Sequence, residues 1–227
     1  MDDDSPGRAA TPTRAQYFAR WSELHGGYDP SQSRLTGGWL SIVYVVAAPF
    51  VRLRVPPDLV TVLGAVVSGV VAWLAALGGR WLLAAAAVVV LSGLIDNLDG
   101  AVAVMTDRVT RWGYVLDSVV DRISDALYLL ALWLAGAPAG VCVGAGVLMG
   151  LQEYARARAG AAGMDEVGVV TVAERPTRVI VTAMFLLGAG WYVDASASWA
   201  TWGAWAWVGL GAVGLLQLLV VVRRRLS

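Results

Sequence analysis

The segment that decides the fold is residues 94–125, which read LIDNLDGAVAVMTDRVTRWGYVLDSVVDRISD. Carboxylates interrupt its two apolar stretches at five positions, and four of them form two pairs: Asp96, Asp99, Asp117 and Asp121. The first two are three residues apart and the last two are four apart, so each pair projects from one face of a helix. Only the short polar segment 106–113 separates the two helices. The pattern therefore predicts antiparallel neighbours that hold all four carboxylates at one depth.

The composition around this segment indicates a membrane protein. Of 227 residues, 58% are hydrophobic and 15% are charged, and the mean hydropathy is +0.64. Soluble domains have about a quarter charged residues, and a helix of roughly 20 apolar residues crosses a bilayer. We therefore expect an all-α integral membrane protein, a six-transmembrane-helix bundle with an N-terminal interfacial amphipathic helix. The expected spans are Asp58–Leu77, Trp81–Met105, Tyr114–Leu134, Ala139–Ala157, Val179–Val193 and Ala200–Val222.

The distribution of arginine orients this bundle. The expected organisation is a cytoplasmic polar segment at 1–35, an interfacial helix at 36–54 and the six-helix domain at 55–227. Of the 17 basic residues, only Arg80 falls in a connection on the opposite side. Because cytoplasmic connections carry the excess of basic residues, this bias predicts a multi-pass protein of the plasma membrane with both termini in the cytoplasm. The formal net charge is zero, and it gives no indication of nucleic-acid binding.

The four aspartates require a compensating charge. An ionised aspartate at the centre of a spanning helix costs about 2.5–3.5 kcal/mol, and four close carboxylates repel one another unless a cation lies among them. Oxygen ligands without Cys or His select a hard ion, so we expect Mg²⁺ or Mn²⁺. The alternative is a buried ion-pair network with Arg122 and Arg111, which leaves several carboxylates unmatched. Asp125, one turn deeper than Asp121, is open to a supporting or a packing role.

The chain resembles the CDP-alcohol phosphatidyltransferases at seven positions with fixed spacing, Asp96-x2-Asp99-Gly100-x2-Ala103-x9-Gly113-x3-Asp117-x3-Asp121. The resemblance implies transfer of a phosphatidyl group from CDP-diacylglycerol to an alcohol, with release of CMP, in phospholipid biosynthesis. One position departs from the family pattern, because Val104 stands where the family usually has arginine. Arg108 or Arg111 in the following turn is expected to supply the missing charge.

The same resemblance implies roles for these residues. Asp96, Asp99 and Asp117 are expected to bind metal, and Asp121 is expected to bind metal or to act as the catalytic base on the acceptor hydroxyl. The residues expected to bind the nucleotide or the CDP-lipid are Gly100, Ala103, Gly113, Arg108 and Arg111. A homodimer is implied by the resemblance alone, and the membrane lipids are expected to surround the bundle.

Two later segments, Tyr154–Ala159 (YARARA) and Glu174–Arg178 (ERPTR), resemble bacterial phosphatidylinositol-phosphate synthases. In those enzymes cytoplasmic arginines line the pocket for the phosphate of the acceptor, and a guanidinium group suits phosphate well. The corresponding residues here are Arg156, Arg158, Arg175 and Arg178, and the implied acceptor is inositol phosphate. The competing interpretation is that these arginines are ordinary anchors at the cytoplasmic surface.

Three other functions fit parts of the pattern. Intramembrane prenyltransferases also use aspartates and Mg²⁺ on lipid diphosphates, but generally have more spans and lack this glycine and alanine spacing. A cation transporter would conduct through the aspartates, but no internal repeat is visible. A diverged, non-catalytic homologue would bind the nucleotide lipid without turning it over, and Val104 is the feature that supports it.

Overall fold

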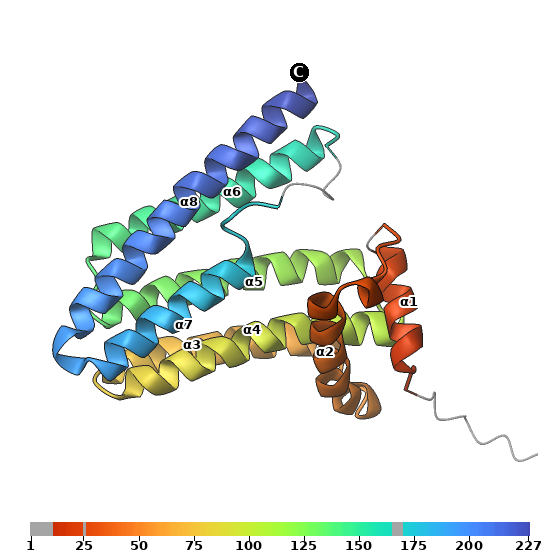
Figure 1. Ribbon diagram of the computed structural model, residues 1–227, viewed down its shortest axis with the longest axis horizontal. Helices are drawn as coiled ribbons and strands as arrows, with labels where there is room; N and C mark the ends of the chain where they lie inside the picture. The colour runs from red at the N-terminus through yellow and green to blue at the C-terminus, as the bar shows by residue number, and fades with distance from the viewer. Residues whose placement is uncertain (1–10, 25, 165–169) are drawn as a thin grey trace, which may run out of the picture.

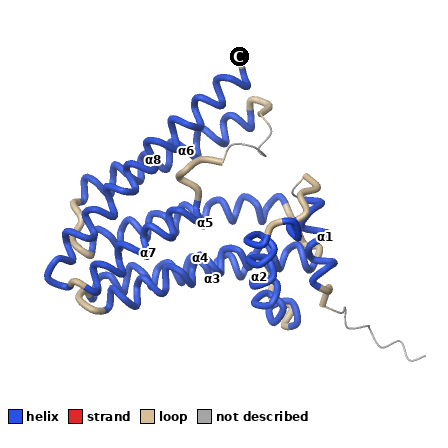
Figure 2. The backbone as a smooth tube through the Cα atoms, in the orientation of Figure 1, coloured by secondary structure: helices blue, strands red, loops and turns tan. Residues whose placement is uncertain are grey.

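The computed structural model describes residues 11–24, 26–164 and 170–227, and every regular element in these residues is helical (Figure 2). The eight α-helices are α1 (Arg14–Leu24), α2 (Arg34–Arg52), α3 (Pro57–Leu77), α4 (Trp81–Thr106), α5 (Arg111–Leu134), α6 (Ala139–Ala161), α7 (Arg175–Trp191) and α8 (Ser196–Leu226). Two short 3-10 helices, η1 (Pro30–Gln32) and η2 (Val193–Ala195), precede α2 and α8. The first ten residues of the predicted polar segment 1–35 lie outside the described residues.

Local capping signals fix where several of these helices begin. Thr13 and Gln16 form a reciprocal capping box at α1, in which each backbone amide donates to the other side chain, at 2.8 and 3.3 Å. The Ser33 hydroxyl accepts the Thr36 amide at the start of α2, and the Thr110 hydroxyl accepts the Gly113 amide at the start of α5. The sequence did not predict α1, because it is polar and Tyr17 is its one buried side chain.

The helices pack as a main group and an inclined pair (Figure 1). In the main group, α4 contacts both α3 and α7, and α3 also contacts α5. The pair consists of α6 and α8, which lie side by side and lean away from the main group toward the C-terminus (Figure 1). One buried apolar cluster contains residues from every helix from α3 through α8, and its large members include Tyr128, Leu186 and Trp207. A second cluster contains residues of α1, α2, α3 and α4, among them Tyr17 and Leu98.

Among the described residues, three helical segments are long and apolar enough to cross a membrane: Pro57–Leu77, Trp81–Thr106 and Val193–Leu226. Of the other helices, α5 and α6 carry several charged residues, and α7 has only 17 residues. Large apolar side chains nevertheless face outward on them, such as Val143 and Ile180, as expected for helices in contact with lipid. The chain is therefore an all-helical membrane protein, and six crossings stay a prediction.

A close contact between α7 and α4 gives a test of this packing. A Cβ atom added at Gly190 would lie 2.7 Å from the backbone nitrogen of Leu83, whereas one added at Gly209 on α8 would meet nothing within 4 Å. We expect Gly190→Ala to destabilise the protein by about 1–3 kcal/mol, because two helix backbones must separate. Gly209→Ala should be neutral or slightly stabilising. Thermal unfolding in detergent measures both; equal melting temperatures for the two variants would contradict this packing.

Candidate active site

The predicted site residues converge at one end of the bundle. They come from the C-terminal half of α4, the N-terminal half of α5, the start of α7 and the end of α6. Asp96, Asp117 and Asp121 each offer a carboxylate oxygen, and these three oxygens lie within 4.8 Å of one another. Such a spacing of oxygen donors fits a single hard divalent cation. The geometry thus brings together three of the four carboxylates expected to bind metal.

Asp99, the fourth, turns toward α3. Its side chain is buried, and Oδ2 accepts a hydrogen bond from the Thr61 hydroxyl at 2.6 Å. The Gly100 amide donates to Oδ1. Thr61 is a site residue that sequence reasoning missed, and the available signal was a polar residue within the apolar run of α3. Asp99 therefore borders the cluster from a fixed position.

Arg175 lies among the carboxylates. Its Nη2 is 2.8 Å from Asp96 Oδ1, and its Nε donates to Asp96 Oδ2 at 2.9 Å. Its Nη1 forms an ion pair with Asp121 Oδ1 at 2.7 Å and donates to the Asp121 carbonyl at 3.1 Å. The first arginine of α7, expected to bind an acceptor phosphate, thus forms ion pairs with two carboxylates of the cluster. A planar guanidinium group makes such paired contacts with carboxylates readily.

A deeper ion-pair network surrounds Asp125. Arg178, only 2% exposed, donates from Nη1 to Asp125 Oδ2 at 2.7 Å. Arg122 pairs with Asp125 at 3.2 Å and with Glu153 on α6 at 2.6 Å. The alternative that invoked Arg122 is therefore partly right, but Arg111 is exposed and outside this network. Asp125 and Arg178 support the site as a buried ion pair.

The remaining predicted arginines lie at the end of α6. Arg156 forms an ion pair with Glu174 at 2.8 Å and a longer one with Glu153 at 3.8 Å, whereas Arg158 is exposed. Burial favours a higher pKa for Glu174, but hydrogen bonds from Thr171 and the pairing with Arg156 outweigh it and hold the pKa below the ordinary value. Glu174 therefore carries charge that fixes Arg156.

A cavity of about 200 Å³ opens beside Asp99 and Asp117, between the start of α3, the end of α4 and the start of α5. Four of the five residues expected to bind nucleotide line this cavity, namely Gly100, Ala103, Arg108 and Gly113. The fifth, Arg111, does not line it. A Cβ atom at Gly100 would meet nothing within 4 Å, whereas one at Gly113 would lie 3.1 Å from the Thr110 hydroxyl that caps α5. Val104 also lines the cavity, as do Pro57, Asp58 and Thr61, which the sequence did not single out.

Comparisons with known proteins agree with this arrangement. The CDP-alcohol phosphatidyltransferase family model matches residues 54–210. An archaetidylinositol phosphate synthase of Methanothermobacter thermautotrophicus is 33% identical over 78% of this chain and 87% of its own length. A phosphatidylinositol phosphate synthase of Cutibacterium acnes is 31% identical over 82% of this chain and 95% of its own.

Solved structures of the Mycobacterium tuberculosis phosphatidylinositol phosphate synthase share the fold. The crystal structure with CDP-DAG bound has a TM-score of 0.67 and 29% identity, and covers 80% of this chain and 94% of that protein. A second crystal structure, in complex with manganese and citrate, has the same TM-score and identity over 79% of this chain and 88% of that protein.

The ion pair between Asp125 and Arg178 yields a stability prediction. Asp125→Asn leaves the buried Arg178 guanidinium without its carboxylate, and we expect a loss of about 3–5 kcal/mol. Adding Arg178→Gln should recover part of this loss, because the double variant contains neither unpaired charge. Thermal unfolding of the two single variants and the double variant in detergent tests the pair. Losses that simply add in the double variant would show that the two residues do not interact.

Proposed function

We propose that this chain, which belongs to the CDP-alcohol phosphatidyltransferase family and so transfers a phosphatidyl group to an alcohol in phospholipid synthesis, uses CDP-diacylglycerol as donor and inositol phosphate as acceptor. The observation that carries the proposal is the three-carboxylate cluster beside the cavity lined by Gly100, Ala103 and Arg108. The named relatives support the acceptor, and the CDP-DAG complex of the mycobacterial enzyme supports the donor.

The carboxylates are assigned to a divalent metal. Asp96, Asp117 and Asp121 would hold it, with Asp99 beside them, and the manganese complex of the mycobacterial enzyme supports a metal of this class. We assign Mg²⁺ as the ion in the cell. When bound, such an ion neutralises charge on the diphosphate and makes CMP a better leaving group. The small cavity would take the nucleotide, because the Gly100 face is open and Arg108 adds a positive charge there.

The acceptor is assigned to the other side of the cluster, where Arg175 and Arg156 lie. Arg175 lies against Asp96 and Asp121 and would bind the acceptor phosphate with a metal ion held by those carboxylates. Glu174 keeps Arg156 oriented at this side. Asp121 then lies beside the acceptor, where its carboxylate takes the proton of the attacking hydroxyl. Arg158 would contribute from the exposed surface, and Arg178 would act through its pairing with Asp125.

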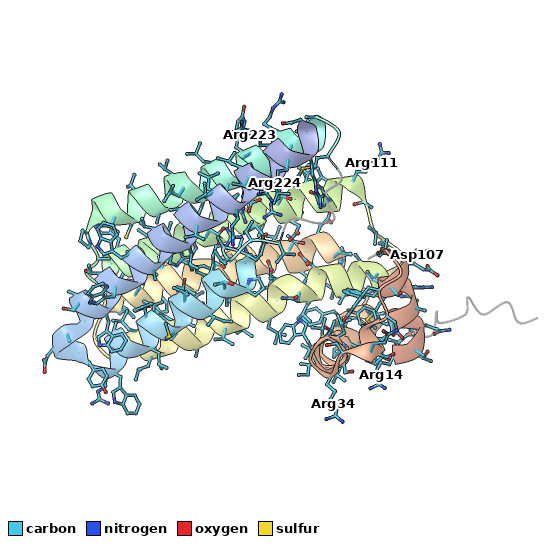
Figure 3. All side chains as sticks on the ribbon, turned by 45° about the horizontal axis from the view of Figure 1, so that its top comes forward. Arg14, Arg34, Asp107, Arg111, Arg223 and Arg224 are labelled. Atoms are coloured by element: carbon cyan, nitrogen blue, oxygen red, sulfur yellow. The ribbon has the colours of Figure 1, made fainter. Side chains whose placement is uncertain are left out.

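The membrane arrangement is part of the proposal. Helices α3 to α8 would make six crossings, residues 36–54 would lie in the interface, and both termini would face the cytoplasm at the plasma membrane. Figure 3 shows Arg14, Arg34 and Arg111 at the end of the bundle where α4 ends and α5 begins, which supports this orientation. A homodimer, and the boundaries at residues 35 and 55, stay predictions.

Release of CMP by purified protein tests the activity. With CDP-diacylglycerol, Mg²⁺ and a panel of inositol phosphate, glycerol phosphate and inositol, we expect release to require inositol phosphate. Asp121→Asn should lower the rate at least roughly 100-fold, because it removes both a metal ligand and the base. Release with glycerol phosphate alone would overturn the acceptor assignment and leave the transferase intact. Release without metal, or undiminished in Asp121→Asn, would contradict the mechanism.

A matched pair of arginines tests the compensation for Val104. Arg108 lines the cavity of about 200 Å³ that we assign to the nucleotide of the donor, the donor cavity, and Arg111 does not line it. Both arginines are exposed, and they are only three residues apart. Arg108→Gln is expected to raise KM for CDP-diacylglycerol by about tenfold, the size of one charge-assisted contact. Arg111→Gln should change KM less than about twofold. Equal effects of the two substitutions in steady-state kinetics would show that the cavity does not hold the nucleotide.

A further inference from the structure

A second and larger cavity, of about 1070 Å³, lies between α1, the connection from α2 to α3 and the C-terminal end of α4. Its charged lining residues are four arginines and one acidic residue: Arg20, Arg52, Arg54, Arg108 and Asp107. None of the metal-cluster aspartates lines it. The cavity touches the donor cavity only through the shared residue Arg108.

Hydrogen bonds hold together the helices that line this cavity. Arg20 Nη1 donates to the carbonyl oxygens of Val104 and Met105 in the last turn of α4, at 3.3 Å each. The Tyr44 hydroxyl donates to the Pro12 carbonyl at 3.0 Å and holds the segment before α1 against α2. These contacts tie α1 to α2 and α4, and they fix the position of the Arg20 guanidinium.

Backbone strain is concentrated at the same place. Arg54 and Asp107 both have φ of 57°, and they are the only non-glycine residues with positive φ in the described part of the chain. This conformation costs an L-residue roughly 1–2 kcal/mol and persists where the surroundings impose it, often at ligand sites. Both strained residues line this one cavity, one from each of its two connecting loops.

The arginines of this cavity differ from those of the active site in their partners. Within the described residues, Arg20, Arg52, Arg54 and Arg108 have no carboxylate partner in an ion pair, whereas Arg122, Arg175 and Arg178 are all paired. Four guanidinium groups around one cavity repel one another, and an anion between them removes that repulsion. Phosphate oxygens match the donor geometry of guanidinium groups best.

We propose that this basic cavity, defined by Arg20, Arg52 and Arg54, binds a phosphate-bearing anion at a site separate from the substrates. An exposed apolar side chain belongs to its lining: Leu53, between Arg52 and Arg54, is 77% exposed. Acyl chains would lie against that side chain while the headgroup phosphate enters the cavity. The headgroup of an anionic phospholipid is therefore the favoured source, and a soluble phosphate is the other.

The test is a binding measurement on the full chain in neutral detergent, without CDP-diacylglycerol, acceptor or divalent metal. The ligands are phosphatidylglycerol, phosphatidylcholine and inorganic phosphate, each followed by native mass spectrometry. The variant is Arg20→Gln/Arg52→Gln/Arg54→Gln. The matched control is Arg223→Gln/Arg224→Gln/Arg225→Gln, which removes the same charge from exposed positions at the end of α8. Because substrates are absent, the result does not depend on the proposed transferase reaction.

We expect the cavity variant to lose phosphatidylglycerol affinity roughly tenfold or more and the control to change less than about twofold. Inorganic phosphate binding that depends on the same three arginines, without preference for phosphatidylglycerol, would assign the site to a soluble phosphate. Equal losses in the two variants would reduce the effect to general surface charge and overturn the proposal. CMP release in detergent should persist in both variants; its loss in the cavity variant alone would show that the cavity belongs to the donor site.

Discussion

The neutralisation of carboxylates within an apolar bundle is the constraint on which the rest of this structure depends. Asp96 and Asp121 come from antiparallel helices, and Arg175, from a third helix, lies between them with ion-pair distances of 2.8 and 2.7 Å. One guanidinium group thus joins α4, α5 and α7 at the end of the bundle that holds the carboxylate cluster. The pairing of Arg178 with Asp125 repeats the link one turn deeper. The burial of so much charge is tolerable only because these partners meet.

Charged residues and a short length explain why three of the six expected crossings are not long and apolar enough to be identified as membrane spans. Helix α5 carries three aspartates and Arg122, α6 carries Glu153 and Arg156, and α7 begins at Arg175 and has only 17 residues. Ionisable residues inside a bilayer protein are rare and usually functional. In this bundle α3 and α8 are predominantly apolar, whereas α4 combines an apolar N-terminal half with Asp96 and Asp99 nearer its C-terminal end.

The sequence predicts contacts between residues that are close together in the chain, and it does not predict contacts between distant ones. Spacings of three and four residues place Asp96 with Asp99 and Asp117 with Asp121, and the short connection before α5 indicates antiparallel helices. These short-range inferences agree with the carboxylate cluster. Arg175 lies 79 residues from Asp96, and Thr61 lies 38 residues from Asp99. Such contacts leave no periodic signal, so the sequence predicts neither the ion pairs of Arg175 nor the contact of Thr61 with Asp99.

The position of Arg175 also affects how the protein folds in the absence of a bound metal ion. A nascent chain that inserts into the bilayer with bare, clustered carboxylates would face strong mutual repulsion, whereas Arg175 acts as a tethered counter-ion at fixed effective concentration. Under the proposed function, metal loading would be an exchange and not a simple addition, because a cation held by Asp96 and Asp121 would displace the Arg175 guanidinium group. The net affinity for the ion would be the difference between these two interactions, and occupancy of the site would respond to any ligand that draws Arg175 away.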